Sequence, residues 1–171
     1  LYKFELGFAE SIYGWSISLM CLFNVLFFYI MGKSRWWHYK KSFFAAVQAL
    51  TVFCLILIVV SRNIFVQLAA AGLTGITYAA VYSSHQYYGV SGGANRSRRM
   101  AIHEIILGTG YAVGSVLGGV ISDHLGRNWP YIFGAIVISL AGLIQVIIWF
   151  ALKQNDQSSS NEKTSFLTSP T

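Results

Sequence analysis

The chain alternates between long apolar stretches and short polar connections. The apolar stretches cover about residues 11–32, 42–61, 64–88, 100–122 and 129–152. A hydrocarbon core about 30 Å thick needs about twenty helical residues rising about 1.5 Å each, so every stretch is long enough to cross a membrane. Because the bilayer core offers no water to backbone N–H and C=O groups, we expect these stretches to be helices. The pattern predicts an all-α, polytopic transmembrane bundle of five spanning helices.

Composition narrows the functional classes. The chain is 55% hydrophobic and 11% charged, well below the roughly 25% charged residues of soluble domains. Its net charge of +6 comes from residues between the apolar stretches rather than on one face, which argues against nucleic acid as a partner. Cys21 and Cys54 fall inside apolar stretches without metal-ligand spacing, and no catalytic or phosphate-binding motif occurs. We expect neither an enzyme nor a cofactor or metal site.

The Lys and Arg residues are divided unevenly between the two ends of the predicted helices. Nine lie in the loops after the first and third helices and in the tail, and three lie on the other side. The positive-inside rule places the richer side in the cytoplasm, with segment 1–10 outside and the polar tail 153–171 inside and disordered. Trp36 and Trp37 are interpreted as interfacial anchors. The predicted location is integral to a plasma or inner membrane.

Glycines recur at four-residue spacing in the fourth apolar stretch. Gly110, Gly114 and Gly118, with Gly119 beside the last, share one helix face and predict a seam where another helix backbone approaches closely. The pattern Gly110-x-x-x-Gly114-Ser115-x-x-Gly118-Gly119 resembles the glycine motif in the fifth helix of major facilitator superfamily antiporters, with Ser115 where a Pro is usual. The halves of that family are related by pseudo-symmetry, so the eleventh helix can carry a similar stretch.

A second resemblance follows directly along the chain. The run Gly119-x-x-Ser122-Asp123-x-x-Gly126-Arg127 is similar to the loop signature of the same superfamily. The family carries this signature on the cytoplasmic side, whereas the charge distribution here places it outside. The alternative interpretation is a tight turn with Gly126 at a helix end.

The resemblance implies a partial major facilitator fold. Five spans followed by a cytoplasmic tail fit helices eight to twelve of a twelve-helix transporter. The chain is therefore expected to be a fragment, and the missing N-terminal half of the same protein is expected to be its partner. Helices two to six would fit the same orientation, but residues 33–41 lack the loop signature. The expected function is transport of a small solute by alternating access. The alternative is a membrane structural or assembly protein whose glycine helix mediates association and which has no solute path.

Polar side chains inside the apolar stretches are candidates for the solute path. They are Asn24, Tyr78, Tyr82 and Tyr111. An amide such as Asn24 costs free energy in the bilayer unless it lines a cavity or bonds to another helix, and both interpretations stay open. Tyr78, Tyr82 and His85 are spaced i, i+4 and i+7 and therefore share a helix face. For His85, a place in the interfacial aromatic belt is the favoured interpretation.

One carboxylate must lie at or within a predicted span. Glu104 follows His103 and lies about one turn beyond Arg99. A carboxylate at this depth must be protonated, paired with a cation or exposed to a cavity. These three residues are therefore candidates for gating or proton coupling, with a simple ion pair at the cytoplasmic mouth as the alternative.

Overall fold

The structure is a computed structural model, and the residues that it describes form five α-helices. It describes residue 7 and the ranges 9–38, 40–90 and 95–168, with the side chains of 41, 90 and 151–168 left out. The helices are α1 (Glu10–Lys33), α2 (Lys41–Val60), α3 (Ile64–Val90), α4 (Arg96–Leu125) and α5 (Trp129–Thr168). All five are long and apolar enough to cross a membrane. The predicted all-α fold with five spanning helices is confirmed.

Helices α4 and α5 extend furthest beyond the stretches that the sequence predicts. Helix α4 begins at Arg96 and ends at Leu125, so it continues beyond the apolar stretch 100–122 at both ends. Helix α5 continues through Thr168 and so differs from the expected disorder over 153–168. That segment contains no Gly or Pro, the two residues that interrupt a helix most strongly. Residues 169–171 of the predicted tail and 1–6 of the N-terminal segment lie outside the described residues.

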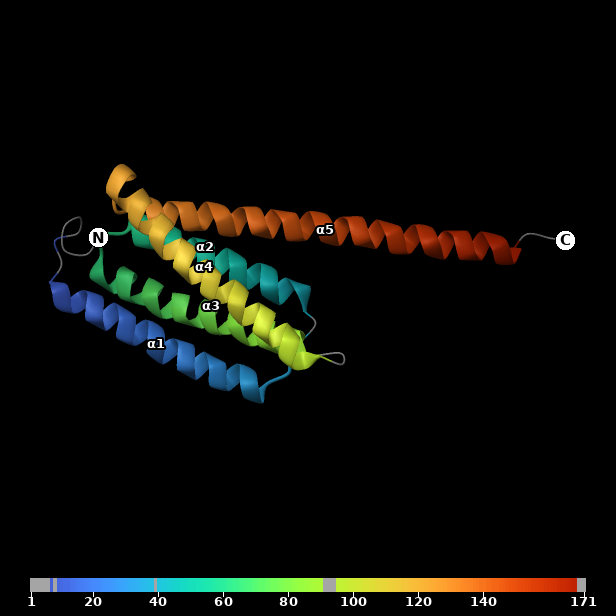
Figure 1. Cartoon of the computed structure of the whole chain (residues 1–171), viewed down its shortest axis with the longest axis horizontal. Helices are drawn as coiled ribbons and strands as arrows, with labels where there is room; N and C mark the ends of the chain where they lie inside the picture. Colours follow the sequence, from blue (N-terminus) through green and yellow to red (C-terminus); the bar gives the residue numbers. More distant parts are fainter. Residues whose placement is uncertain (1–6, 8, 39, 91–94, 169–171) are drawn as a thin grey trace.

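Consecutive helices run antiparallel, and α3 is the central one (Figure 1). Helix α3 packs against α1, α2 and α4, while α2 also packs against α5. The buried face of α3 is built from small side chains, including Ala70, Ala71, Ala79 and Ala80. Small residues let helix backbones approach closely, which supplies dispersion contacts where lipid provides no hydrophobic driving force.

The closest approach joins α1 to α3. A Cβ atom added to Gly75 would clash with the carbonyl oxygen of Met20, and one added to Gly72 would lie 3.1 Å from the ring of Phe23. The Asn24 side chain donates a hydrogen bond from Nδ2 to the carbonyl oxygen of Gly75 at 3.4 Å. Asn24 is therefore a half-buried interhelical contact, the second of the two interpretations that the sequence allows.

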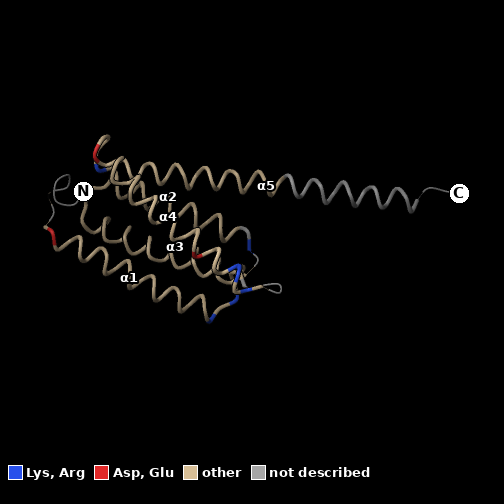
Figure 2. The backbone as a smooth tube through the Cα atoms, in the orientation of Figure 1, with Lys and Arg blue, Asp and Glu red and all other residues tan. Residues whose placement is uncertain are grey.

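Lys and Arg residues gather at the end of the bundle where α1 ends and where α2 and α4 begin (Figure 2). The loop between α1 and α2 is packed at this end. Trp37 is only 3% exposed and its Nε1 donates to the carbonyl oxygen of Met31 at 3.1 Å, so its interpretation as an interfacial anchor is wrong. Trp36 is exposed, as an anchor would be. One indole holds the loop together and its neighbour faces outward.

At the other end, Gln67 ties α2 to α3. Its buried Nε2 donates to the carbonyl oxygens of Ile58 at 2.8 Å and of Ser61 at 2.7 Å. Ile58 lies in the last turn of α2 and Ser61 is its C-cap residue, so neither carbonyl has an intrahelical donor. Gln67 therefore caps α2 from the first turn of α3 and closes the hairpin between the two helices.

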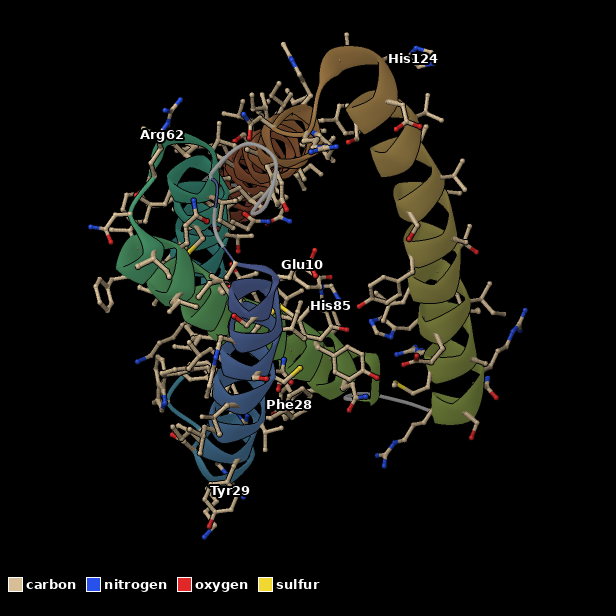
Figure 3. All side chains as sticks on the ribbon, turned by 90° about the vertical axis from the view of Figure 1, so that its left-hand side faces the viewer. Glu10, Phe28, Tyr29, Arg62, His85 and His124 are labelled. Carbon is tan, nitrogen blue, oxygen red and sulfur yellow. The ribbon has the colours of Figure 1, made fainter. Side chains whose placement is uncertain are left out.

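Helix α4 is the least packed of the five. It contacts only α3 and α5 among the described helices, and none of its residues is buried. Figure 3 shows α4 standing apart from α1, with side chains of α3 and α4 directed toward each other. The packed core of the bundle is thus α1, α2, α3 and the adjoining face of α5.

The contact at Gly75 yields a stability prediction. In Gly75→Ala, the new methyl group must displace backbone of α1, so we expect the free energy of unfolding in micelles to fall by about 1–3 kcal/mol or more. Gly14→Ala in α1 is the matched control, because a Cβ there meets nothing within 4 Å. Denaturation by sodium dodecyl sulfate, followed by tryptophan fluorescence, measures both variants. Equal stability of the two would contradict the close approach.

Candidate functional site

Polar side chains of α3 and α4 meet along one face. The hydroxyl groups of Tyr78 and Tyr111 hydrogen-bond to each other across the two helices. Further along, the Tyr82 hydroxyl donates to Oε1 of Glu104 at 3.2 Å. As the residue number increases along α3 from 78 to 82, the number of its partner on α4 decreases from 111 to 104, as antiparallel helices require. The i, i+4 spacing of Tyr78 and Tyr82 thus produces a continuous polar face.

His103 extends this polar cluster. Its Nδ1 lies 3.4 Å from Oε1 of Glu104, and its ring meets that of His85 edge to face at 5.4 Å between centroids. Both ring nitrogens of His103 are buried and make no hydrogen bond within the part of the chain that the structure describes. A buried polar group without a partner costs free energy. His103 therefore has hydrogen-bonding capacity available for a further group.

Aromatic rings frame the cluster. The rings of Tyr78 and Tyr82 are stacked, with centroids 6.2 Å apart and planes 8° from parallel. Phe28 of α1 packs on Tyr82 at 5.6 Å between centroids. In Figure 3, His85 points from α3 into the space before α4. Three helices therefore contribute to the cluster, which offers flat apolar faces as well as hydroxyl, carboxylate and imidazole groups.

The cluster is open on one side. Tyr78 is 46% exposed and Tyr111 is 54% exposed, while the Glu104 side chain is 51% exposed. Ionisable and polar groups at this depth rarely face lipid and usually line a water-filled cavity or another protein surface. The open side of the α3–α4 face therefore leaves these polar groups accessible to water, a solute or another part of the protein.

The structure brings together five of the predicted residues. Tyr78, Tyr82, Tyr111, His103 and Glu104 form the cluster described above. Two others lie elsewhere: Asn24 holds α1 to α3, and Arg99 is exposed one turn earlier on α4.

Two residues of this cluster, His85 and Phe28, were not predicted from the sequence to belong to it. His85, assigned to the interfacial belt, lies against His103, and its place in the belt stays a prediction. Its i+7 spacing from Tyr78 was the available signal. Phe28 carried no signal in the sequence, because one more aromatic residue in an apolar helix is ordinary.

The predicted glycine seam on α4 is unoccupied by other helices of the described chain. A Cβ atom added to Gly110, Gly114, Gly118 or Gly119 would meet no heavy atom within 4 Å. The close helix contact uses glycines of α3 instead. A role of the α4 seam in packing against another part of the protein stays a prediction.

Gly126 ends α4 in a turn. Its φ of 105° lies in the region that favours glycine, and its N–H donates to the carbonyl oxygen of Ser122 at 3.0 Å. The interpretation of this segment as a tight turn at a helix end is confirmed. Across the residues that the structure describes, no group of three His, Cys, Asp or Glu side chains could hold a metal ion.

A comparison with protein families supplies the identification. A family model described as Major Facilitator Superfamily matches residues 1–170. The chain belongs to the Major Facilitator Superfamily. This superfamily consists of membrane transporters, so the chain is a membrane transport protein, and the predicted family is confirmed. Comparisons with curated proteins and with solved structures gave no match.

The bond between Tyr78 and Tyr111 can be measured by a double-mutant cycle. We expect Tyr78→Phe and Tyr111→Phe to show an interaction free energy of about 0.6 kcal/mol, and at most about 1.7 kcal/mol, as other hydrogen bonds between membrane helices do. The free energies of unfolding of both single variants and the double variant give this term. Tyr29→Phe in α1 is the control partner, since its exposed ring lies under Lys33. Tyr78→Phe should be additive with Tyr29→Phe and non-additive with Tyr111→Phe.

Proposed function

We propose that this chain forms one wall of the solute path in a transporter that moves a small solute by alternating access. The observation that carries the proposal is the polar cluster between α3 and α4, centred on Tyr82 and Glu104. Polar and ionisable residues are costly within a membrane, and where they occur they mark substrate or ion pathways. Membership of the Major Facilitator Superfamily supports the same conclusion.

The cluster suits reversible binding of a solute. Hydroxyl groups of Tyr78 and Tyr111 can exchange their mutual bond for bonds to a solute, because bonds of this kind contribute only about 0.6 kcal/mol. Nε2 of His103, which makes no hydrogen bond within the described residues, offers a further one. Stacked tyrosine rings supply a flat apolar surface. A solute with both polar groups and an apolar face would use all three features.

Helix α4 is the element that moves in this proposal. It has no buried residue, and its contacts with α3 include the polar pairs of the cluster. Such contacts can be exchanged without opening a packed core, so two arrangements of α4 can differ by only a few kcal/mol. Glu104 and His103 would couple this movement to a proton or act as a gate, with Arg99 nearer the helix start.

Orientation completes the proposal. The basic end of the bundle faces the cytoplasm, the N-terminus lies outside, and the N-terminal half of the protein supplies the opposite wall. The uneven distribution of Lys and Arg, which Figure 2 shows at one end, supports this orientation. The protein would then lie in a plasma or inner membrane.

Cysteine labelling tests the path. In a Cys21→Ser background, Tyr78→Cys and Tyr111→Cys should react in membranes with a water-soluble maleimide, because a solute path admits water. Ala79→Cys is the matched control beside Tyr78, since Ala79 is fully buried and should react far more slowly. Asn24→Cys should also react slowly, because Asn24 lies in the α1–α3 contact. Labelling of Tyr78→Cys at no more than the rate of Ala79→Cys would overturn the proposal.

The glycine seam of α4 has its own test. We expect Gly114→Leu to lower the thermal stability of the whole transporter, because a neighbouring helix outside the described residues would pack there. Gly108→Leu is the matched control, since Gly108 is equally open but lies on another face of α4. Equal melting temperatures of the two variants would show that the seam has no packing partner.

A further inference from the structure

An apolar groove lies away from the polar cluster, between α1, α2 and α3. Its volume is about 570 Å³, within the range of about 300–1,000 Å³ that is typical of ligand sites. The inner lining is apolar and comes from all three helices: Phe27, Val47, Leu50, Ile76 and Ala80. A groove of this character suits a hydrocarbon chain better than a polar solute.

The groove is as deep as one leaflet. Its lining on α2 runs from Ser42 to Leu50 and its mouth includes Lys40. At about 1.5 Å per helical residue, the distance from Lys40 to Leu50 is about 15 Å. Half of a hydrocarbon core about 30 Å thick is the same length. The groove therefore begins at the membrane surface and ends near the midplane.

The mouth of the groove combines a cation with an interfacial indole. Lys40 and Trp36 both line it, and both are exposed. The Trp36 ring packs edge to face on Phe43 at 5.1 Å between centroids. Indole rings settle at the headgroup level, and a lysine amine there attracts phosphate. The polar end of a lipid would thus meet a positive charge directly above the apolar groove.

The surroundings of the mouth are uniformly positive. The run 33–41 contains Lys33, Arg35, Lys40 and Lys41 and no acidic residue. Arg96, Arg98 and Arg99 lie at the same end of the bundle (Figure 2). A zwitterionic headgroup gains little from such a field, whereas a headgroup with net negative charge is attracted. Charge complementarity therefore selects an anionic lipid.

The backbone at the mouth is held in place. The N–H of Lys40 donates to the carbonyl oxygen of Trp37 at 3.3 Å, and the N–H of Phe43 donates to the carbonyl oxygen of Lys40 at 3.1 Å. Trp37 is buried against Met31 and is bonded to its carbonyl oxygen. The position of Lys40 relative to the groove is therefore fixed by packed structure, which lowers the entropy lost on binding.

We propose that this groove binds an anionic phospholipid of the leaflet at the basic end of the bundle. One acyl chain lies between α1, α2 and α3, and the phosphate lies at Lys40. The site is separate from the polar cluster between α3 and α4.

Photo-crosslinking of lipid to the whole transporter in nanodiscs tests the proposal. The probes are phosphatidylglycerol and phosphatidylcholine that carry a diazirine in one acyl chain, each diluted into phosphatidylcholine. We expect the phosphatidylglycerol probe to label peptides that line the groove and the phosphatidylcholine probe to label them less. Lys40→Gln should lower phosphatidylglycerol labelling roughly fivefold, the value expected for loss of one charge near the surface.

Matched variants separate a built site from a diffuse field. Lys33→Gln removes the same charge from the end of α1, next to the loop that carries Lys40, but the Lys33 amine lies over the Tyr29 ring and outside the groove, so we expect less than a twofold change. Ala46→Phe should fill the groove and abolish labelling there. Ala49→Phe, exposed on the same helix outside the groove, should leave labelling unchanged.

Three results would overturn the proposal. Equal labelling by the two probes would show that the groove accepts any lipid. Equal losses in Lys40→Gln and Lys33→Gln would show that only the general field acts. Full displacement of the phosphatidylglycerol probe by inorganic phosphate would show that the acyl chain adds nothing.

Discussion

The close contact between α1 and α3 is the interaction on which the bundle depends. Lipid chains are as apolar as leucine, so helices gain nothing by hiding apolar side chains from them and must gain from tight packing. Gly72 and Gly75 provide that packing, because they admit the Phe23 ring and the backbone of Met20. The hydrogen bond from Asn24 adds a directional element at the same level. Helices α1, α2 and α4 all pack on α3, and α5 packs on α2 and α4.

Helix α3 makes two different kinds of contact with its neighbours. Contacts of α3 with α1 and α2 are made by small buried side chains and by the Gln67 cap. The contact of α3 with α4 is instead made by hydroxyl, carboxylate and imidazole groups that remain partly exposed. Packed interfaces resist small displacements, whereas exchangeable polar bonds tolerate them. The division gives α4 weaker attachment to α3 than α1 and α2 have.

The spans and the tyrosine face could be predicted from the sequence, because both follow from periodicities along one helix. Tyr78 and Tyr82 had to share a face whatever lay opposite. Which glycines meet a neighbour could not be predicted, because spacing on one helix says nothing of its partner. The glycines spaced four apart on α4 meet no other described helix, while Gly75 of α3 contacts the backbone of α1. The interpretation of Trp37 as an anchor was wrong for the same reason, because the burial of this ring depends on how the loop folds onto α2 and α3.

Helix α3 presents different chemistry on its two sides within a single turn. Ile76 and Ala80 line the apolar groove, and Tyr78 between them reaches α4. A helix is stiff over so short a distance, so neither side can shift without the other. Gln67 carries that rigidity into α2. A lipid chain that pushed Ile76 or Ala80 aside would therefore also move Tyr78 and strain its bond to Tyr111.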